Sequence, residues 1–277
     1  MRKRFKSLIE PYFFIILVNY IFWIILYSPA NVLSPIVNIF WANTVDGIPI
    51  AGALWFLTSL FFVYLIAYFL DKIADDRRRI FAIVSLAIIG TLFRFVPFRL
   101  PLGLDCAIEG TAFFEIGYFM QRKRTLAFLI QSGKCKIIFL SIASLIISIP
   151  LIFVNGVVNF RDLKFAILPL TFINVLLSLT AYLGLSRLIS ISRYKWIKCI
   201  QYELQFVGRN TMVFLGFHQL ARWFVIRIVN RLIFMNFFGF SIVRGFCYVT
   251  GCIVACQILV YILNKINPIR KMLHIIV

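Results

Sequence analysis

The stretch Gly52–Asp71, GALWFLTSLFFVYLIAYFLD, decides the fold class, because it is long and apolar enough to cross a bilayer. It is followed at once by the charged run KIADDRRR at residues 72–79. Its first turns carry Trp55, Thr58 and Ser59, and the question is what that end of the segment faces. An indole ring with its N–H group suits a membrane interface, so we expect Trp55 to lie there.

The composition of the whole chain supports a membrane protein. Hydrophobic residues make up 62% of the 277 residues and charged residues only 14%, whereas about a quarter of a soluble domain is charged. The net charge of +19 does not indicate a nucleic-acid partner, because the basic residues form short clusters between apolar runs. The six cysteines show no metal-ligand spacing, so we expect no metal site. Four of them lie within apolar segments and are expected to serve packing: Cys106, Cys247, Cys252 and Cys256.

We predict an all-α, polytopic membrane helical bundle that forms a single domain over residues 1–277. Two of its segments contain more than one charged residue, and either could instead be an amphipathic helix on the membrane surface. The eight candidate spans are 11–28, 51–70, 80–96, 105–120, 137–154, 165–186, 210–229 and 242–264, of which 105–120 and 210–229 are the two with more than one charged residue.

The distribution of Lys and Arg predicts the orientation in the cell membrane. If residue 1 is cytoplasmic, the inner segments hold 21 of the 29 basic residues and the outer loops hold 4. Positive charge accumulates on the cytoplasmic side of membrane proteins, so both termini are expected inside. Removing only one of the two charged spans would place the basic C-terminal tail outside, so this pattern favours keeping both.

A first group of charged residues lies in the outer half of the predicted bundle. Asp105 and Glu109 are four residues apart and therefore share a helix face. The turn after residue 96 would bring Arg94 within reach of that face. We expect these three residues to form either a structural ion pair between helices or the lining of a polar cavity open to the outer side.

Two further groups could carry chemistry. Thr211, His218 and Arg222 form a polar stripe at helical spacing, and a neutral His218 could act as a general base or make an interhelical hydrogen bond. Arg2 and Arg4, in the basic start of the chain, set orientation or bind an anionic headgroup or phosphate-bearing donor. These residues fit a transporter as well as a membrane transferase.

Four strings, in order along the chain, carry a resemblance to a known family. They are KRFKSLIEPY from residue 3, GALWFLTSLFFVYL from residue 52, LPLGLDCAIEGTAFFEIGYFMQRK from residue 100 and VGRNTMVFLGFHQL from residue 207. Together they resemble the membrane acyltransferases of acyltransferase family 3, whose members move an acyl group, usually acetyl, from cytoplasmic coenzyme A to a hydroxyl of an envelope sugar. No cofactor bound to the protein is implied, and acetyl-CoA would be a co-substrate.

The resemblance also suggests roles for particular residues. Trp55 would lie near the acceptor side and position the sugar, and His218 matches a histidine common at that point of the family. Arg2 and Arg4 match a positively charged inner stretch that follows the family's second span. Asp105 falls, together with Glu109, in a segment where polar residues are frequent but not fixed.

The resemblance begins after the family's first two helices, so we expect this chain to lack them. The family's best-supported catalytic residue is a histidine in its first span, and His218 would then be a substitute for it. Ser7 also stands where many relatives carry a second arginine. Two alternatives therefore stay open: a transporter or flippase of an anionic glycolipid that uses Arg94 and Arg222 as counter-charges, and a catalytically inactive remnant.

Overall fold

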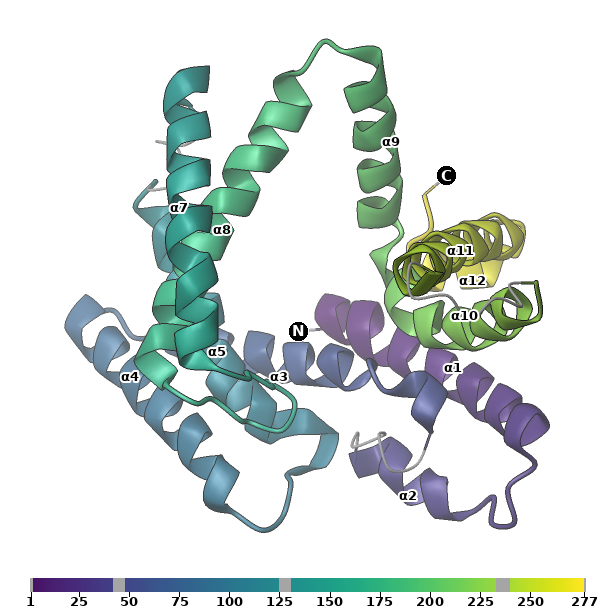
Figure 1. The fold of residues 1–277 in the computed structure, drawn as a ribbon. Coiled ribbons are helices and arrows are strands. Elements are labelled where there is room, and N and C mark those ends of the chain that lie inside the picture. The colour runs from purple at the N-terminus through teal and green to yellow at the C-terminus, as the bar shows by residue number, and fades with distance from the viewer. Residues whose placement is uncertain (1, 42–47, 125–130, 233–239, 277) are drawn as a thin grey trace. The chain divides into compact units, whose positions relative to one another are not determined.

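The structure is a computed structural model that describes residues 2–41, 48–124, 131–232 and 240–276. These residues form eleven α-helices and three short 3-10 helices (Figure 1). They divide into two compact units, which are described in turn. The first comprises Met1–Phe61, Arg99–Leu104 and Gln205–Val277, and the second comprises Phe62–Phe98 and Asp105–Leu204.

The first unit is built around α1 (Arg2–Tyr27), which contacts α10 (Thr211–Leu232) and η1 (Pro49–Ala51). α1 and α10 approach closely at Gly216, where an added Cβ would lie 2.8 Å from Ile15 Cδ1. α11 (Phe240–Asn264) packs against α10. The unit also holds α2 (Ser34–Trp41), η3 (Pro101–Gly103), α12 (Asn267–Met272), the start of α3 (Trp55–Leu70) and the end of α9 (Lys195–Arg209).

A buried asparagine joins the C-terminal segment to the helical frame of this unit. Asn210, at the junction of α9 and α10, is 1% exposed. Its amide nitrogen donates to the carbonyl oxygens of Phe206 at 3.0 Å and Ile276 at 2.8 Å, and its Oδ1 accepts from the Ile276 nitrogen at 3.0 Å. All these groups are polar backbone or amide groups that would be costly to bury alone, so Asn210 has a structural role.

The second unit contains the rest of α3 together with α4 (Asp76–Leu92), α5 (Leu104–Arg122), α7 (Lys134–Asn155) and α8 (Leu168–Ile191). Asp75 caps α4 by accepting a hydrogen bond from the Arg77 nitrogen at 3.0 Å, as the start of a helix requires. α7 and α8 pack along their length, and small residues allow it: Ser141 lies against Gly184, and Ser144 and Ser148 are also buried. Small residues commonly line helix contacts in membranes.

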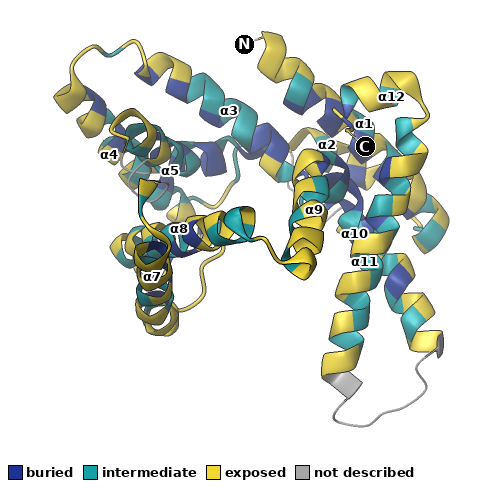
Figure 2. Ribbon diagram, turned by 90° about the horizontal axis from the view of Figure 1, so that it is seen from above, coloured by how far each residue is buried: buried dark blue, intermediate teal, exposed yellow. Residues whose placement is uncertain are grey.

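All eight predicted spans coincide with helices, which confirms an all-α membrane helical bundle. Within the described ranges, α1, α7, α8, α10 and α11 are long and apolar enough to cross a bilayer, while α3 is apolar but shorter. Figure 2 shows α11 as intermediate and exposed for the most part, while α1 has more buried residues, in agreement with buried shares of 11% and 44% in the apolar windows of the two helices. Exposed apolar surface of this kind suits contact with lipid.

Three helices lie in segments that were predicted only as connections. They are α2, α9 and α12. α9, KWIKCIQYELQFVGR, has apolar and polar residues on opposite faces, a pattern that stabilises a helix at a membrane surface but gives no long apolar run. A search for spans of about 20 apolar residues therefore passes over such helices.

Candidate active site

The imidazole of His218 is held by its own helix. Its Nδ1 lies 3.0 Å from the carbonyl oxygen of Phe214 and 3.1 Å from that of Leu215. Carbonyl oxygens only accept hydrogen bonds, so Nδ1 must carry a proton. In the neutral ring, Nε2 then keeps its lone pair, and because His218 is only partly buried, that atom is chemically suited to accept a proton.

Asn19 fixes the turn of α10 that precedes His218. Its side chain is 0% exposed, and its Nδ2 donates to the carbonyl oxygens of Gly216 at 3.0 Å and Ile15 at 3.1 Å. Its Oδ1 is buried and has no hydrogen-bond partner among the described residues. The sequence analysis missed Asn19, although a single asparagine within the apolar run of residues 11–28 is a signal that could have found it.

Two further contacts hold the same turn of α10 from other elements. The backbone nitrogen of Gly52 donates to Gln219 Oε1 at 2.6 Å, and the Cys252 thiol donates to the carbonyl oxygen of His218 at 3.2 Å. Gln219 was also missed, although it follows His218 directly. Groups from α1, the segment after η1 and α11 therefore fix the backbone around His218, and such support is what a precisely placed base needs.

Arg222 lies one turn after His218 and is exposed. Thr211 is exposed and His218 is half-buried, whereas Val213 and Phe217 on the other side of α10 are buried. The predicted polar stripe is therefore the less buried side of α10. Within the described residues, Arg222 forms no ion pair, so its charge remains available to an anionic group.

Trp55 begins α3 and is partly buried, with its ring edge-on to Phe56 at a centroid distance of 6.2 Å. Thr58 is 0% exposed and donates to the Trp55 carbonyl oxygen at 2.9 Å, and Ser59 is 4% exposed. Gly103, which has a φ of +69°, packs against Ser59 and that carbonyl. Ser59 and the Trp55 carbonyl oxygen therefore face the turn η3, while Thr58 is buried and bonds to its own helix.

Arg2 and Arg4 lie in the first turns of α1, where both are exposed. Lys3 and Lys6 flank them, and the first turn of α1 contains no acidic residue. This end of α1 is therefore strongly positive, as the sequence predicts. Arg2, Arg4, Trp55, His218 and Arg222 all belong to the first unit.

The predicted ion pair of Arg94 with Asp105 or Glu109 is wrong. Arg94 is exposed, donates to the Phe165 carbonyl oxygen at 3.2 Å and lies over the Phe95 ring at 4.4 Å, and no ion pair joins it to either carboxylate in the part of the chain that is described. α4 tightens at this point into η2 (Phe93–Phe95). A continuous α-helix would keep Arg94 on the face of Gly90 that packs on α5, and the 3-10 turn rotates it away.

Asp105 and Glu109 lie on the buried side of α5, at 1% and 0% exposed. Asp105 Oδ1 accepts from the Cys106 nitrogen at 2.9 Å, and Glu109 Oε2 accepts from Thr91 Oγ1 at 3.2 Å. Glu109 Oε1 has no hydrogen-bond partner among the residues described. Gly90 makes room for this carboxyl group, since a Cβ there would lie 2.6 Å from Glu109 Oε2.

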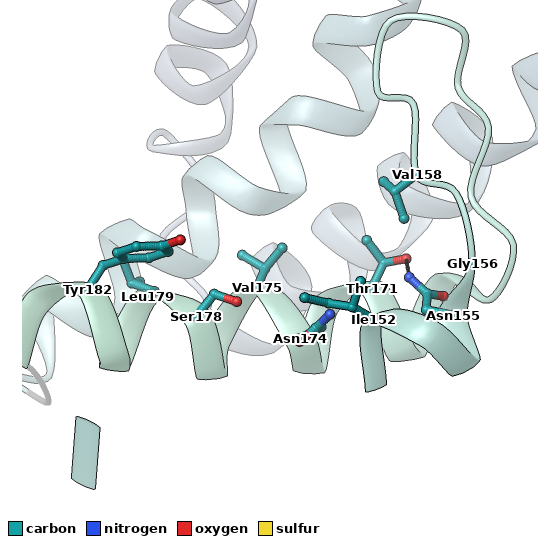
Figure 3. A pocket seen from close by; sticks show the side chains of 10 residues that line it. All are labelled: Ile152, Asn155, Gly156, Val158, Thr171, Asn174, Val175, Ser178, Leu179 and Tyr182. Carbon is teal, nitrogen blue, oxygen red and sulfur yellow. Dashed lines mark hydrogen bonds between the residues drawn. The ribbon is translucent and has the colours of Figure 1, made fainter. Parts of the chain in front are cut away.

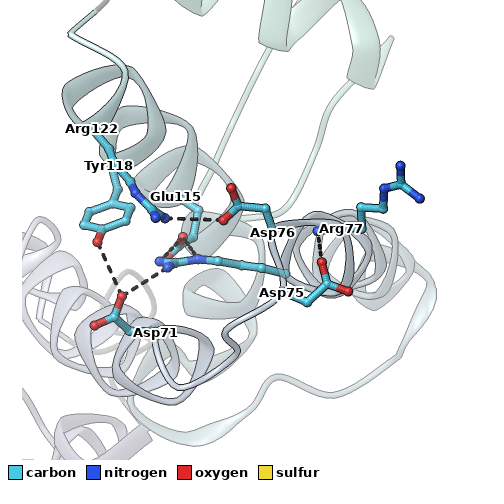
Figure 4. A network of polar contacts seen from close by, with 8 residues as sticks. Asp71, Asp75, Asp76, Arg77, Glu115, Tyr118 and Arg122 are labelled. Atoms are coloured by element: carbon cyan, nitrogen blue, oxygen red, sulfur yellow. Dashed lines mark hydrogen bonds and ion pairs between the residues drawn. The ribbon is translucent and has the colours of Figure 1, made fainter.

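The second unit contains an ion network that sequence analysis missed, in which Arg79 and Glu115 are buried and Asp71 is exposed (Figure 4). Arg79 donates to Glu115 Oε2 through Nε at 3.1 Å and an Nη at 2.7 Å, and to Asp71 Oδ1 at 3.0 Å. Its guanidinium lies 4.7 Å from the centre of the Tyr118 ring. The sequence contained a signal for this network, because Glu115 lies inside a predicted span, near the same end as Arg79. Asp71, Arg79 and Glu115 come from three segments, so this network holds α3, α4 and α5 together.

The described residues contain no cluster of three His, Cys, Asp or Glu side chains that could hold a metal ion. The residues suited to chemistry are His218, whose Nδ1 is held by two carbonyl oxygens, and Arg222 one turn away, which forms no ion pair with any described residue. They lie in a helical protein with several bilayer-length apolar helices. Fold and site therefore define an integral membrane protein with a candidate base within its helices.

Comparison with known families makes this assignment more specific. The family model described as an acyltransferase domain, that of acyltransferase family 3, matches residues 1–261. The chain belongs to this family and is in general terms a membrane acyltransferase. Neither a curated protein nor a solved structure matches it.

Proposed function

We propose that this protein transfers an acyl group, usually acetyl, from cytoplasmic acyl-CoA to a hydroxyl of a cell-envelope sugar, with His218 as the general base. The observation that carries the proposal is the contact of His218 Nδ1 with the carbonyl oxygens of Phe214 and Leu215. It fixes the tautomer in which Nε2 accepts a proton. A base placed in this way typically contributes about 10²- to 10⁴-fold to a rate.

The reaction balances with these groups. His218 Nε2 takes the proton of the acceptor hydroxyl, and the oxygen attacks the thioester carbonyl carbon. The tetrahedral intermediate collapses, the carbon–sulfur bond breaks, and the coenzyme A thiolate takes the proton back from the imidazolium. Arg222, exposed one turn further along α10, would stabilise the negative charge that develops on the carbonyl oxygen.

The two substrates would approach from opposite sides of the cell membrane. The positive start of α1, with Arg2 and Arg4 exposed, would bind the phosphates of acyl-CoA on the cytoplasmic side, where both termini are expected. Trp55 at the start of α3 would stack on the acceptor sugar. Asp105 and Glu109 are part of the proposal as buried carboxyl groups. Glu109→Gln tests the carboxyl group of Glu109, because this change keeps the shape of the side chain and removes its charge.

The chain offers a matched control for the base, because it has only two histidines. His218→Gln should reduce formation of base-labile esters on the envelope glycan by about 10²-fold or more, measured by mass spectrometry at equal protein level. His274 is exposed and has a φ of 52°, a conformation that asparagine tolerates. His274→Asn should therefore leave ester formation unchanged.

Two results would overturn the proposal. Ester formation that persists in His218→Gln would show that His218 is not the base. An ester content that does not depend on the gene at all, together with a changed distribution of a glycolipid between the leaflets, would favour a flippase.

A further inference from the structure

A groove of about 540 Å³ lies along α7 and α8 in the second unit, and none of its lining residues belongs to the site around His218 (Figure 3). This volume is within the range of about 300–1,000 Å³ that small-molecule sites occupy. The lining combines polar and apolar side chains and contains no charged one: Ile152, Asn155, Gly156, Val158, Thr171, Asn174, Val175, Ser178, Leu179 and Tyr182.

The polar groups of the groove follow one side of α8. Thr171, Asn174, Ser178 and Tyr182 fall within an arc of about 80° at 3.6 residues per turn. Asn155 closes the end of the groove: it is 2% exposed, donates to Thr171 Oγ1 at 3.0 Å and accepts from the Ile167 nitrogen at 3.2 Å. Asn155 and Thr171 therefore satisfy each other and form a fixed end wall.

The remaining polar groups of the groove are not satisfied by the protein. Asn174 Oδ1 is buried and has no hydrogen-bond partner in the described ranges. Ser178 and Tyr182, one and two turns further along, form no hydrogen bond through their hydroxyl groups there either. A buried polar atom without a partner is costly, as Asn174 Oδ1 is here, so the groove is suited to a ligand that supplies one.

The chemistry of the lining indicates which ligand this is. Amides and hydroxyls both donate and accept hydrogen bonds, as do the hydroxyls of a sugar. The absence of charged side chains from the lining suits a neutral ring. Ile152, Val175 and Leu179, with the Tyr182 ring, offer apolar surface to the C–H face of such a ring. A lipid tail would leave Asn174 and Ser178 without partners.

We propose that the α7–α8 groove binds one neutral sugar residue of a lipid-anchored acceptor, whose tail stays in the bilayer. This inference rests on the proposed function, because it assigns the acceptor of that reaction a binding subsite. Asn174 and Ser178 select the hydroxyls, and Asn155 with Thr171 closes the end of the subsite.

Photolabelling of the full chain in lipid nanodiscs tests this without any acyl donor. The probe is a glucosyl dialkylglycerol that carries a diazirine on the sugar ring, and labelled peptides are mapped by mass spectrometry. Label is expected within residues 152–158 and 171–182. Asn174→Leu, of similar size, should weaken it at least tenfold, and Tyr182→Phe should weaken it less, because Tyr182 is 67% exposed.

Thr180→Val is the matched control, because Thr180 lies on the same helix outside the groove and donates to the Leu176 carbonyl oxygen at 2.9 Å. It should label like the unchanged protein. Equal labelling of Asn174→Leu at equal protein level would overturn the proposal. So would equal labelling by the same lipid with its diazirine on the glycerol and no sugar, or cross-linked dimers joined through α8.

The outcomes also separate this inference from the proposed function. Label in the groove without ester formation in cells would support the sugar subsite and refute the proposed transferase function. Ester formation with an acceptor KM that Asn174→Leu leaves unchanged would keep the transferase and refute the subsite.

Discussion

The network of Arg79, Glu115 and Asp71 gives the sharpest prediction for stability. Arg79→Leu leaves Glu115, which is 1% exposed, without either nitrogen donor to its Oε2, while its Oε1 already lacks a partner within the described residues. Removing one partner of a buried pair costs about 3–5 kcal/mol, so we expect the free energy of unfolding to fall by about 4 kcal/mol.

Glu115→Leu should cost less, about 3 kcal/mol, because Arg79 keeps Asp71 at 3.0 Å and the Tyr118 ring. The double change to leucine leaves no buried charge and should cost less than either single change, since apolar residues often replace a buried pair without loss. The assay is unfolding of the purified protein in mixed micelles by increasing SDS, followed by tryptophan fluorescence.

Arg122→Leu is the control, because the Arg122–Asp76 pair is exposed at 54% and 51% and should contribute less than about 1 kcal/mol. If the free-energy losses of Arg79→Leu and Glu115→Leu simply add in the double variant, the two side chains are not coupled and the reasoning fails.

Two other predictions concern packing and orientation. Gly90→Ala should destabilise the protein by about 1–3 kcal/mol, because its Cβ would lie 2.6 Å from Glu109 Oε2 and 2.8 Å from the backbone of Glu109. Gly117→Ala on α5, with nothing within 4 Å, should instead stabilise it by about 0.5–1 kcal/mol in the same assay. A reporter that is active only outside the cytoplasm should give signal when fused after Asn159 and none after Lys271. Signal after Lys271 would refute the orientation.

The positions of the spans could be predicted from the sequence, while the contacts between them could not. Apolar length, together with the distribution of Lys and Arg, located eight of the eleven described α-helices, because a bilayer requires about 20 apolar residues for each crossing. The contact of Arg94 was predicted wrongly, because a 3-10 turn at Phe93 rotates the side chain and no apolar pattern records such a turn. Asn19 and Gln219 were missed because each is a single polar residue whose partner, Gly216 or Gly52, lies far away in the chain.

The sequence by itself determined that this is an all-α membrane protein of acyltransferase family 3, and it singled out His218, because composition, apolar length and ordered strings are properties of the chain alone. Only the tertiary structure decided what surrounds that histidine, through Asn19 and Cys252, which hold its part of α10 from two other helices. It also decided that Glu115 pairs with Arg79, which the sequence analysis had not linked. The physical reason is that hydrogen bonds and ion pairs act over about 3 Å, so they depend on how the helices pack against one another, which apolar periodicity does not specify.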